Sequence, residues 1–219
     1  MKVKIDINLN VNRVVKYLIM VDLFLWGGWG FVQPMFSIFI LKKIEGSTLT
    51  TIGLAGAVYW VVKSLVQLPV ASYLDKREGE KDDFYALVVS LLILGVVAFW
   101  FALVEKIWQL FVVQFFFALG FALYTPAWSG IFSRHLDSER HSFDWSLDST
   151  VLGLAVGVSG ALGGLLAQLF GFSVVFMVAG LLSLVSALVL FWVPELVLPK
   201  PSSSPPPIFQ PKSIKITQS

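Results

Sequence analysis

Cysteine is absent from this chain of 219 residues. The protein therefore has no disulfide framework, no thiolate metal site and no cysteine nucleophile. Histidine is scarce as well, because the chain has only His135 and His141, which lie in one polar loop with an arginine beside each. A loop pair without further ligands at metal spacing is typical of solvated side chains. We therefore expect no metal and no cofactor.

Charge is also scarce. Asp, Glu, Lys and Arg make up 14% of the chain, against about 25% in ordinary soluble domains. The sequence contains neither a phosphate-binding glycine loop of the G-x-x-x-x-G-K-[ST] kind nor an H-E-x-x-H motif. No nucleophile–base set is visible either. We therefore expect neither enzymatic activity nor a nucleic-acid partner.

Long apolar runs are what the chain has instead. Six runs of roughly 20–26 residues are each long enough to cross a ~30 Å hydrocarbon core as a helix. They are Tyr17–Leu41, Leu49–Leu74, Tyr85–Val104, Ile107–Phe132, Ser149–Phe170 and Ser173–Pro194. Asp22 and Lys63 are the only formally charged side chains within them, so none has the wide polar face of a soluble helix. The sequence predicts an all-α integral membrane protein with six transmembrane helices.

The basic residues are distributed unevenly about these spans. Of the 16 Lys and Arg residues, Lys63 lies within a span, and Lys42, Lys43 and Lys106 lie on the side opposite the N-terminus. The other twelve lie on the N-terminal side. Because loops rich in Lys and Arg face the cytoplasm, we expect both termini to be cytoplasmic, in the plasma membrane of a bacterium or an archaeon.

This topology divides the chain into three parts. The first span counts as part of the transmembrane domain, because it is too long and too aromatic for a signal peptide, whose apolar region is about 7–15 residues long. The parts are a cytoplasmic N-terminal segment (1–16), a six-helix transmembrane domain (17–194) and a cytoplasmic, flexible tail rich in Pro and Ser (195–219).

Polar and aromatic side chains recur at helical spacing in the first, second and fourth spans. Residues three and four apart share one face of a helix, and three such faces indicate a shared, partly hydrated cavity. The candidate substrate-binding or coupling residues are Asp22, Trp26, Trp29, Gln33, Lys63, Gln67, Gln114, Tyr124 and Trp128. The alternative is that the aromatic residues pack helices together and the glutamines bond across interfaces.

Lys63 lies near the middle of the second span. A central lysine costs at least about 2.5–3.5 kcal/mol, so it should face protein or water and have a partner. Asp22 is the only acid within a span and is within reach of an extended lysine. One interpretation is a structural ion pair, or a lysine that reaches to the interface. The other is a charged site that binds an anionic group or takes part in proton coupling.

Small residues form a strip along the fifth span. They are Gly153, Gly157, Gly160 and Gly164, at steps of four, three and four. Such a strip lets another helix backbone approach closely, because association in lipid depends on van der Waals contact. The packing is either within one subunit or across a gate or a dimer contact.

The first and fourth spans look like copies of each other. Gly30-Phe31 precedes Pro34 in one, and Gly120-Phe121 precedes Pro126 in the other, with a serine three residues after each proline. With three spans to a unit, the second copy is inverted in the membrane. Paired Gly/Pro interruptions in inverted halves indicate a transporter binding site. The pattern predicts a 3+3 inverted repeat.

These features together resemble the N-terminal half of a major facilitator superfamily (MFS) transporter. Trp29-Gly30-Phe31-x-x-Pro34 is similar to the first helix of that family. The loop 71–81 resembles its G-x-x-x-D-R-x-G-R-R signature, although Ala71 replaces the first glycine and one residue is inserted before Gly79. By this resemblance, the cytoplasmic gate motif comprises Asp75, Lys76, Arg77 and Gly79.

Other positions depart from the family pattern. Phe116 stands where the fourth helix of the family has an arginine, and Ser159-Gly160 stands where its antiporters have Gly-Pro. Both departures argue against drug/proton antiport. The family has two halves of six spans each, so the chain resembles a natural half-size member with six helices.

The resemblance implies an MFS-like secondary transporter subunit that moves a small solute by alternating access, with H⁺ or Na⁺ as the coupling ion. One half supplies only one wall of the usual cavity, so we expect a homodimer in the lipid bilayer, the second span of one subunit facing the fifth span of the other. The alternative is a non-transporting accessory or regulatory membrane protein built on half of the fold.

Overall fold

The structure is a computed structural model that describes residues 11–76, 79–137, 140–192, 194 and 198. These residues form helices without strands. The predicted tail lies almost entirely outside the described residues, as does most of the predicted N-terminal segment. The helices are α1 (Arg13–Val32), the short 3-10 helix η1 (Gln33–Met35), α2 (Phe36–Lys43), α3 (Leu49–Asp75), α4 (Lys81–Phe101), α5 (Ile107–Arg134), α6 (His141–Phe170) and α7 (Phe172–Trp192).

The six predicted membrane spans are confirmed as helices. The first comprises α1, η1 and α2, and α3 to α7 supply the other five; each is long and apolar enough to cross a membrane. Four helices begin earlier than their apolar runs. α4 begins at Lys81 and not at Tyr85, and α7 begins one residue before its run. α1 begins at Arg13 and not at Tyr17, and α6 begins at His141 and not at Ser149. The reason is that a helix can continue beyond the hydrocarbon core, where polar side chains are tolerated.

Local chemistry accounts for several helix ends. The Asn12 side chain accepts a hydrogen bond from the Val14 N–H at the start of α1. Thr48 and Thr51 form a reciprocal capping box at the start of α3, and such a cap satisfies backbone donors that the helix leaves free. Gly171 ends α6 with a φ of 86°, a conformation that glycine adopts without a steric cost.

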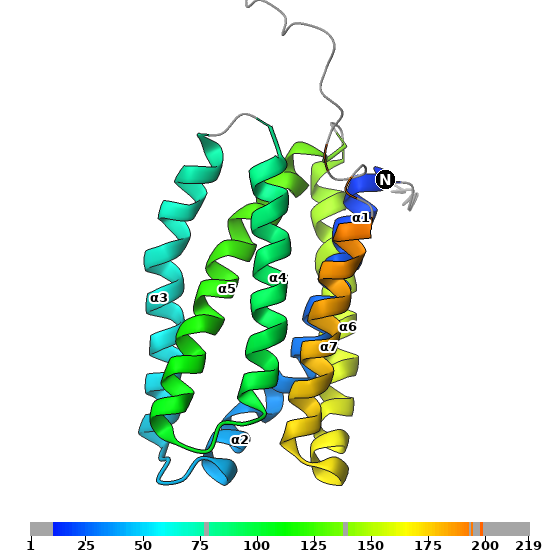
Figure 1. Ribbon diagram of the computed structural model, residues 1–219. Coiled ribbons are helices and arrows are strands. Elements are labelled where there is room, and N and C mark those ends of the chain that lie inside the picture. Colours follow the sequence, from blue (N-terminus) through cyan, green and yellow to red (C-terminus); the bar gives the residue numbers. More distant parts are fainter. Residues whose placement is uncertain (1–10, 77–78, 138–139, 193, 195–197, 199–219) are drawn as a thin grey trace, which may run out of the picture.

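The helices pack as two groups of three, α3, α5 and α4 on the left of Figure 1 and α1, α6 and α7 on the right. Within the groups, α5 packs against α3 and α4, and α1 packs against α6 and α7. The contact between α4 and α7 joins the groups, whereas α1 and α5 approach each other only locally. The separation of α1 from α3 leaves room for a cavity.

Helices α1 and α6 are in close backbone contact. A Cβ atom built on Gly163 would lie 2.3 Å from the Phe31 carbonyl oxygen, and one built on Gly30 would lie 2.9 Å from the Val156 Cα. Gly160 and Gly164 also face this contact, whereas Gly153 and Gly157 have nothing within 4 Å of a built Cβ. The predicted glycine strip is therefore divided between a contact within the subunit and an open surface.

Candidate functional site

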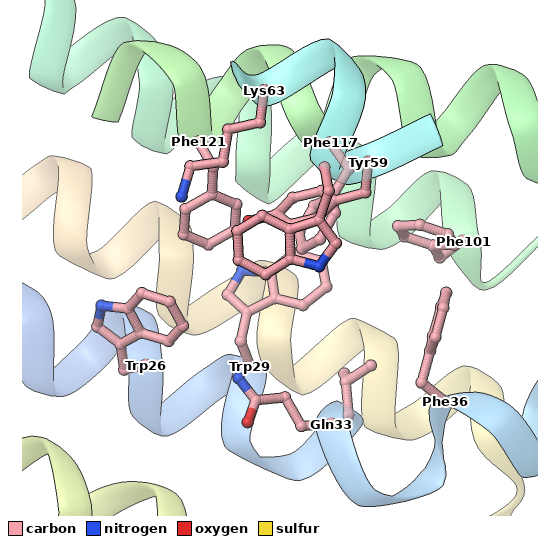
Figure 2. A pocket seen from close by; sticks show the side chains of 11 residues that line it. Trp26, Trp29, Gln33, Phe36, Tyr59, Lys63, Phe101, Phe117 and Phe121 are labelled. Atoms are coloured by element: carbon pink, nitrogen blue, oxygen red, sulfur yellow. The ribbon is translucent and has the colours of Figure 1, made fainter. Parts of the chain in front are cut away.

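A cavity of about 310 Å³ lies between α1–η1 and α3, with α5 behind it. Its size is at the lower end of small-molecule sites, which measure about 300–1,000 Å³. Figure 2 shows Trp26, Trp29 and Gln33 on one side of the cavity and Tyr59 and Lys63 on the other. The lining residues are Trp26, Trp29, Val32, Gln33, Phe36, Tyr59, Trp60, Lys63, Phe101, Phe117 and Phe121.

Aromatic rings make up most of the cavity wall. The Trp29 and Phe117 ring centroids are 4.4 Å apart, and those of Trp26 and Phe121 are 5.3 Å apart. Tyr59 lies 5.1 Å from Phe117. Rings at these separations attract one another beyond the effect of burial alone, so they bridge the space where the α1 and α5 backbones diverge.

Among the described residues that line the cavity, only Lys63 carries a charge. Its Nζ lies 5.3 Å from the Trp60 ring centroid and 5.9 Å from the centroids of Tyr59 and Phe121. These are cation–π distances. No ion pair joins Lys63 to Asp22, so the structure does not contain the ion pair that the sequence offered as one interpretation. The ion pair does not form because the cavity separates α1, which carries Asp22, from α3, which carries Lys63, and because Asp22 has another partner.

That partner is Tyr124. Its hydroxyl donates a hydrogen bond to Asp22 Oδ1, and both side chains are buried. Asp22 and Tyr124 are therefore held between α1 and α5 and do not line the cavity. The spacing on α1 correctly places Asp22, Trp26 and Trp29 on one face. Helix α5 covers the N-terminal part of that face, at Asp22, and the C-terminal part, at Trp26 and Trp29, lines the cavity.

A second acid, Asp148, lies at the level of Asp22, because α1 and α6 run in the same direction and Gly30 of α1 contacts Val156 of α6. It lies on α6, is 5% exposed, and its Oδ1 has no hydrogen-bond partner among the described residues. The sequence analysis missed it, because the apolar run of the fifth span begins one residue later. Asp22 and Lys63 remain the only charged residues of the predicted runs, but α6 extends beyond its run and carries Asp148 as a buried side chain.

Comparison with known proteins identifies the family and the fold. The family model of the major facilitator superfamily matches residues 18–218. The chain belongs to the major facilitator superfamily. A crystal structure of the POT family transporter PepTSo has a similar fold, with a TM-score of 0.64 at 15% sequence identity. The match covers 90% of this chain and 40% of that one. The comparison with curated proteins finds no match.

Three further residues that the sequence analysis predicts to bind substrate or the coupling ion lie apart from the cavity. Gln114 is buried, and its Oε1 has no hydrogen-bond partner among the described residues. Trp128 stacks on Phe132 at 4.5 Å and donates a hydrogen bond to the Leu18 carbonyl at 3.5 Å. Gln67 lies on α3 but is not among the lining residues. The cavity instead includes Phe36 and Phe101, which carry no polar signal in the sequence.

The gate motif implied by the superfamily lies where α3 ends. Asp75 is the last residue of α3, Lys76 follows it, and both are exposed. Gly79 has a φ of 94°, which favours glycine. Arg77 lies outside the described residues.

An ion-pair cluster, formed by Glu80, Asp83, Arg134 and His135, lies at the same end of the bundle. Arg134 Nε donates to Glu80 Oε1 at 2.8 Å, and its Nη2 donates to Asp83. His135 Nδ1 is 3.6 Å from the same Glu80 oxygen. The cluster ties the start of α4 to the end of α5. The sequence analysis missed it, because its members are about fifty residues apart in the chain.

Proposed function

We propose that this chain is one subunit of a secondary transporter that moves a small solute across the membrane by alternating access. The observation that carries the proposal is the cavity between α1–η1 and α3, whose aromatic wall holds Lys63. A cation at membrane depth is costly and is typical of substrate and ion pathways. In MFS transporters, solute sites lie near the bilayer midplane, and one half rocks against the other.

We propose that the working unit is a homodimer whose second subunit supplies the other wall. In the most apolar parts of α3 and α6 only 11% of the residues are buried, against 39–56% in the other spans. Gly53 and Gly56 on α3, like Gly153 and Gly157 on α6, would leave open space around an added Cβ. These two helices thus carry small residues that nothing covers within the described chain, which favours contact between α3 and α6 of different subunits.

We also propose that the six helices are a 3+3 inverted repeat with both termini in the cytoplasm. The first helix of each predicted unit packs on the second and third helices of the other unit: α1 on α6 and α7, and α5 on α3 and α4. This reciprocity is expected of two related units. The excess of Lys and Arg on the N-terminal side supports the orientation.

We propose that transport is coupled to protons through Asp22 and Asp148. Helices α1 and α6 run in the same direction (Figure 1), and Gly30 on α1 is level with Val156 on α6. Asp22 and Asp148 each lie eight residues before these positions, so the two acids are level as well. Two buried carboxyl groups at the same level of a bundle repel when both are charged, so such a pair favours sharing one proton. Solute movement that separates α1 from α5 would break the Tyr124 hydrogen bond, which stabilises the charged Asp22 carboxylate, and would therefore favour uptake of a proton by the pair.

The test is uptake by purified protein in liposomes under an imposed pH gradient or an imposed Na⁺ gradient. We expect accumulation that follows the pH gradient, and Asp148→Asn should abolish that dependence. Accumulation driven by Na⁺ alone would refute proton coupling. No uptake of any solute would favour the accessory or regulatory role.

The homodimer is tested by cysteines at Gly56 and Gly157, which face no other part of the described chain. Because α3 and α6 do not pack against each other within one subunit, a disulfide between them must join two subunits. Gly157→Leu should separate the subunits, whereas Val96→Leu on the exposed face of α4 should not. Transport by a protein that stays monomeric in lipid would refute the dimer.

A further inference from the structure

The cavity wall is rich in hydrogen-bond donors and poor in acceptors. Six of its side chains carry a nitrogen or an oxygen atom, and four of them can only donate. The donors are the indole N–H groups of Trp26, Trp29 and Trp60 and the ammonium group of Lys63. Gln33 and Tyr59 can both donate and accept, and none of the eleven lining residues is acidic. A ligand that satisfies this wall must supply acceptors.

One of these donors has no partner although it is buried. Trp29 is 3% exposed, and its Nε1 makes no hydrogen bond among the described residues. A buried donor without an acceptor costs about 1–3 kcal/mol, and structures retain such groups where a ligand or water completes them. The Trp29 ring lies in the wall of the cavity, opposite the helix that carries Lys63 (Figure 2).

Lys63 is likewise not neutralised. Its contacts are the faces of three aromatic rings, and no ion pair joins it to a described carboxylate. Ring faces attract a cation but do not cancel its charge. The remaining charge favours an anionic group close to Nζ.

The shape and chemistry of the rest of the wall restrict the body of the ligand. Phe36, Phe101 and Phe117 offer only carbon and hydrogen atoms, and the cavity has the volume of about ten water molecules. Flat apolar groups pack well against aromatic rings. A small inorganic anion or a sugar would leave most of this wall without apolar contact.

We propose that the solute is a small organic anion, a carboxylate on a flat apolar body, with its charged end at Lys63 and Trp29. This assignment rests on the proposed transport function, of which it specifies the substrate class. The apolar body lies against Phe36, Phe101 and Phe117. Binding neutralises Lys63 and gives the buried indole N–H its acceptor.

The test compares probes that share one body and differ in charge. Calorimetric titration of the purified protein in lipid nanodiscs uses 3-phenylpropionate, its neutral amide, the cation 3-phenylpropylamine and, as a charge without the body, acetate. We expect 3-phenylpropionate to bind at least about tenfold more tightly than the amide, as a charged hydrogen bond implies. The amine and acetate should bind more weakly than the amide.

Variants at Lys63 assign the preference to this residue. Lys63→Met keeps a long side chain that packs on aromatic rings, so it should bind the anion no better than the amide and should bind the amide as before. Lys63→Arg keeps the charge and should keep the preference. Equal binding of the anion and the amide by the unaltered protein, a better fit of the amine, or no binding of 3-phenylpropionate would overturn the proposal.

Uptake of radiolabelled 3-phenylpropionate into liposomes separates this inference from the proposed function. Binding with the expected preference but without uptake contradicts the transport function and leaves the anion site standing. Uptake of a neutral or cationic solute, together with no anion preference in titration, contradicts the anion site and leaves transport standing.

Discussion

Lys63 and Arg134 are both cations on the long helices of the bundle, but their surroundings differ. Arg134 lies at the end of α5 and donates hydrogen bonds to Glu80 and Asp83, whose side chains are 6% and 4% exposed. Lys63 lies within α3 and contacts only ring faces around a cavity. The first arrangement is complete within the chain and joins two helices. In the second arrangement Lys63 has no anionic partner among the described residues, as expected of a site that binds an anionic ligand.

The largest expected effect is the loss of Arg134. Arg134→Met leaves two buried carboxyl groups without their donor. Because the Arg134 side chain is itself 41% exposed and partly screened by solvent, the free energy of unfolding should fall by about 2–4 kcal/mol, the cost of an unmet hydrogen bond at each acid. Arg134→Lys, which keeps the charge but not the planar fork of donors, should lower it by less. Thermal unfolding of the purified protein measures both. An unchanged unfolding temperature for Arg134→Met would show that the cluster is not a structural link.

The expected effect on stability at Asp22 lies between those at Arg134 and Lys63, because Asp22 has one hydrogen-bonding partner, Tyr124. Tyr124→Phe removes the hydroxyl that donates to the buried carboxyl group and should cost about 1–3 kcal/mol of stability. Tyr85→Phe is the matched control, since Tyr85 is exposed on α4. If both variants unfold at the same temperature, the hydrogen bond to Asp22 contributes nothing to stability.

A smaller effect is expected when the whole Arg134 arrangement is replaced. Glu80→Met, Asp83→Leu and Arg134→Met in one protein exchange the ion pairs for apolar side chains. Such exchanges are often neutral or stabilising, so stability should return to within about 1 kcal/mol of the original. Failure of the triple variant to recover would mean that the acids also hold partners beyond Arg134.

The smallest effect on stability is expected at Lys63. Lys63→Met removes a cation from membrane depth, where it costs about 2.5–3.5 kcal/mol on insertion scales, and breaks no ion pair. The ligand-free protein should therefore unfold at the same temperature or a higher one. A loss of stability comparable to that of Arg134→Met would show that Lys63 has a structural role, and the contrast between the two cations would fail.

The sequence predicts the fold well because membrane helices are long and uniformly apolar. It also places Trp26, Trp29 and Gln33 on the face that lines the cavity, because their spacing follows the helix. The same spacing cannot tell which part of a face a neighbouring helix covers. Asp22 therefore falls in the predicted site but is buried against Tyr124.

The residues that the sequence analysis missed lacked a local signal. Asp148 precedes an apolar run, and only the extension of α6 back to His141 shows that its side chain is buried. Phe36 and Phe101 resemble the many other phenylalanines of the chain. The ion-pair partners of Arg134 come from a different helix end, and no periodicity connects positions so far apart in the sequence.

The interruption of the first span at η1 determines how the cavity can change shape. Pro34 has no N–H to donate to the carbonyl of Gly30, four residues earlier, so α2 is joined to α1 by fewer hydrogen bonds than one helical turn is joined to the next. On the N-terminal side of this point Gly163 fixes α1 against α6. On its C-terminal side, Phe36 forms part of the cavity wall. We expect a change of angle at Pro34 to move the Phe36 side of the wall while the Trp26 side stays in place. Distances between spin labels at Ser37 and at Val158, which is exposed on α6, measured with and without bound ligand, would detect this bending, and equal distances would exclude it.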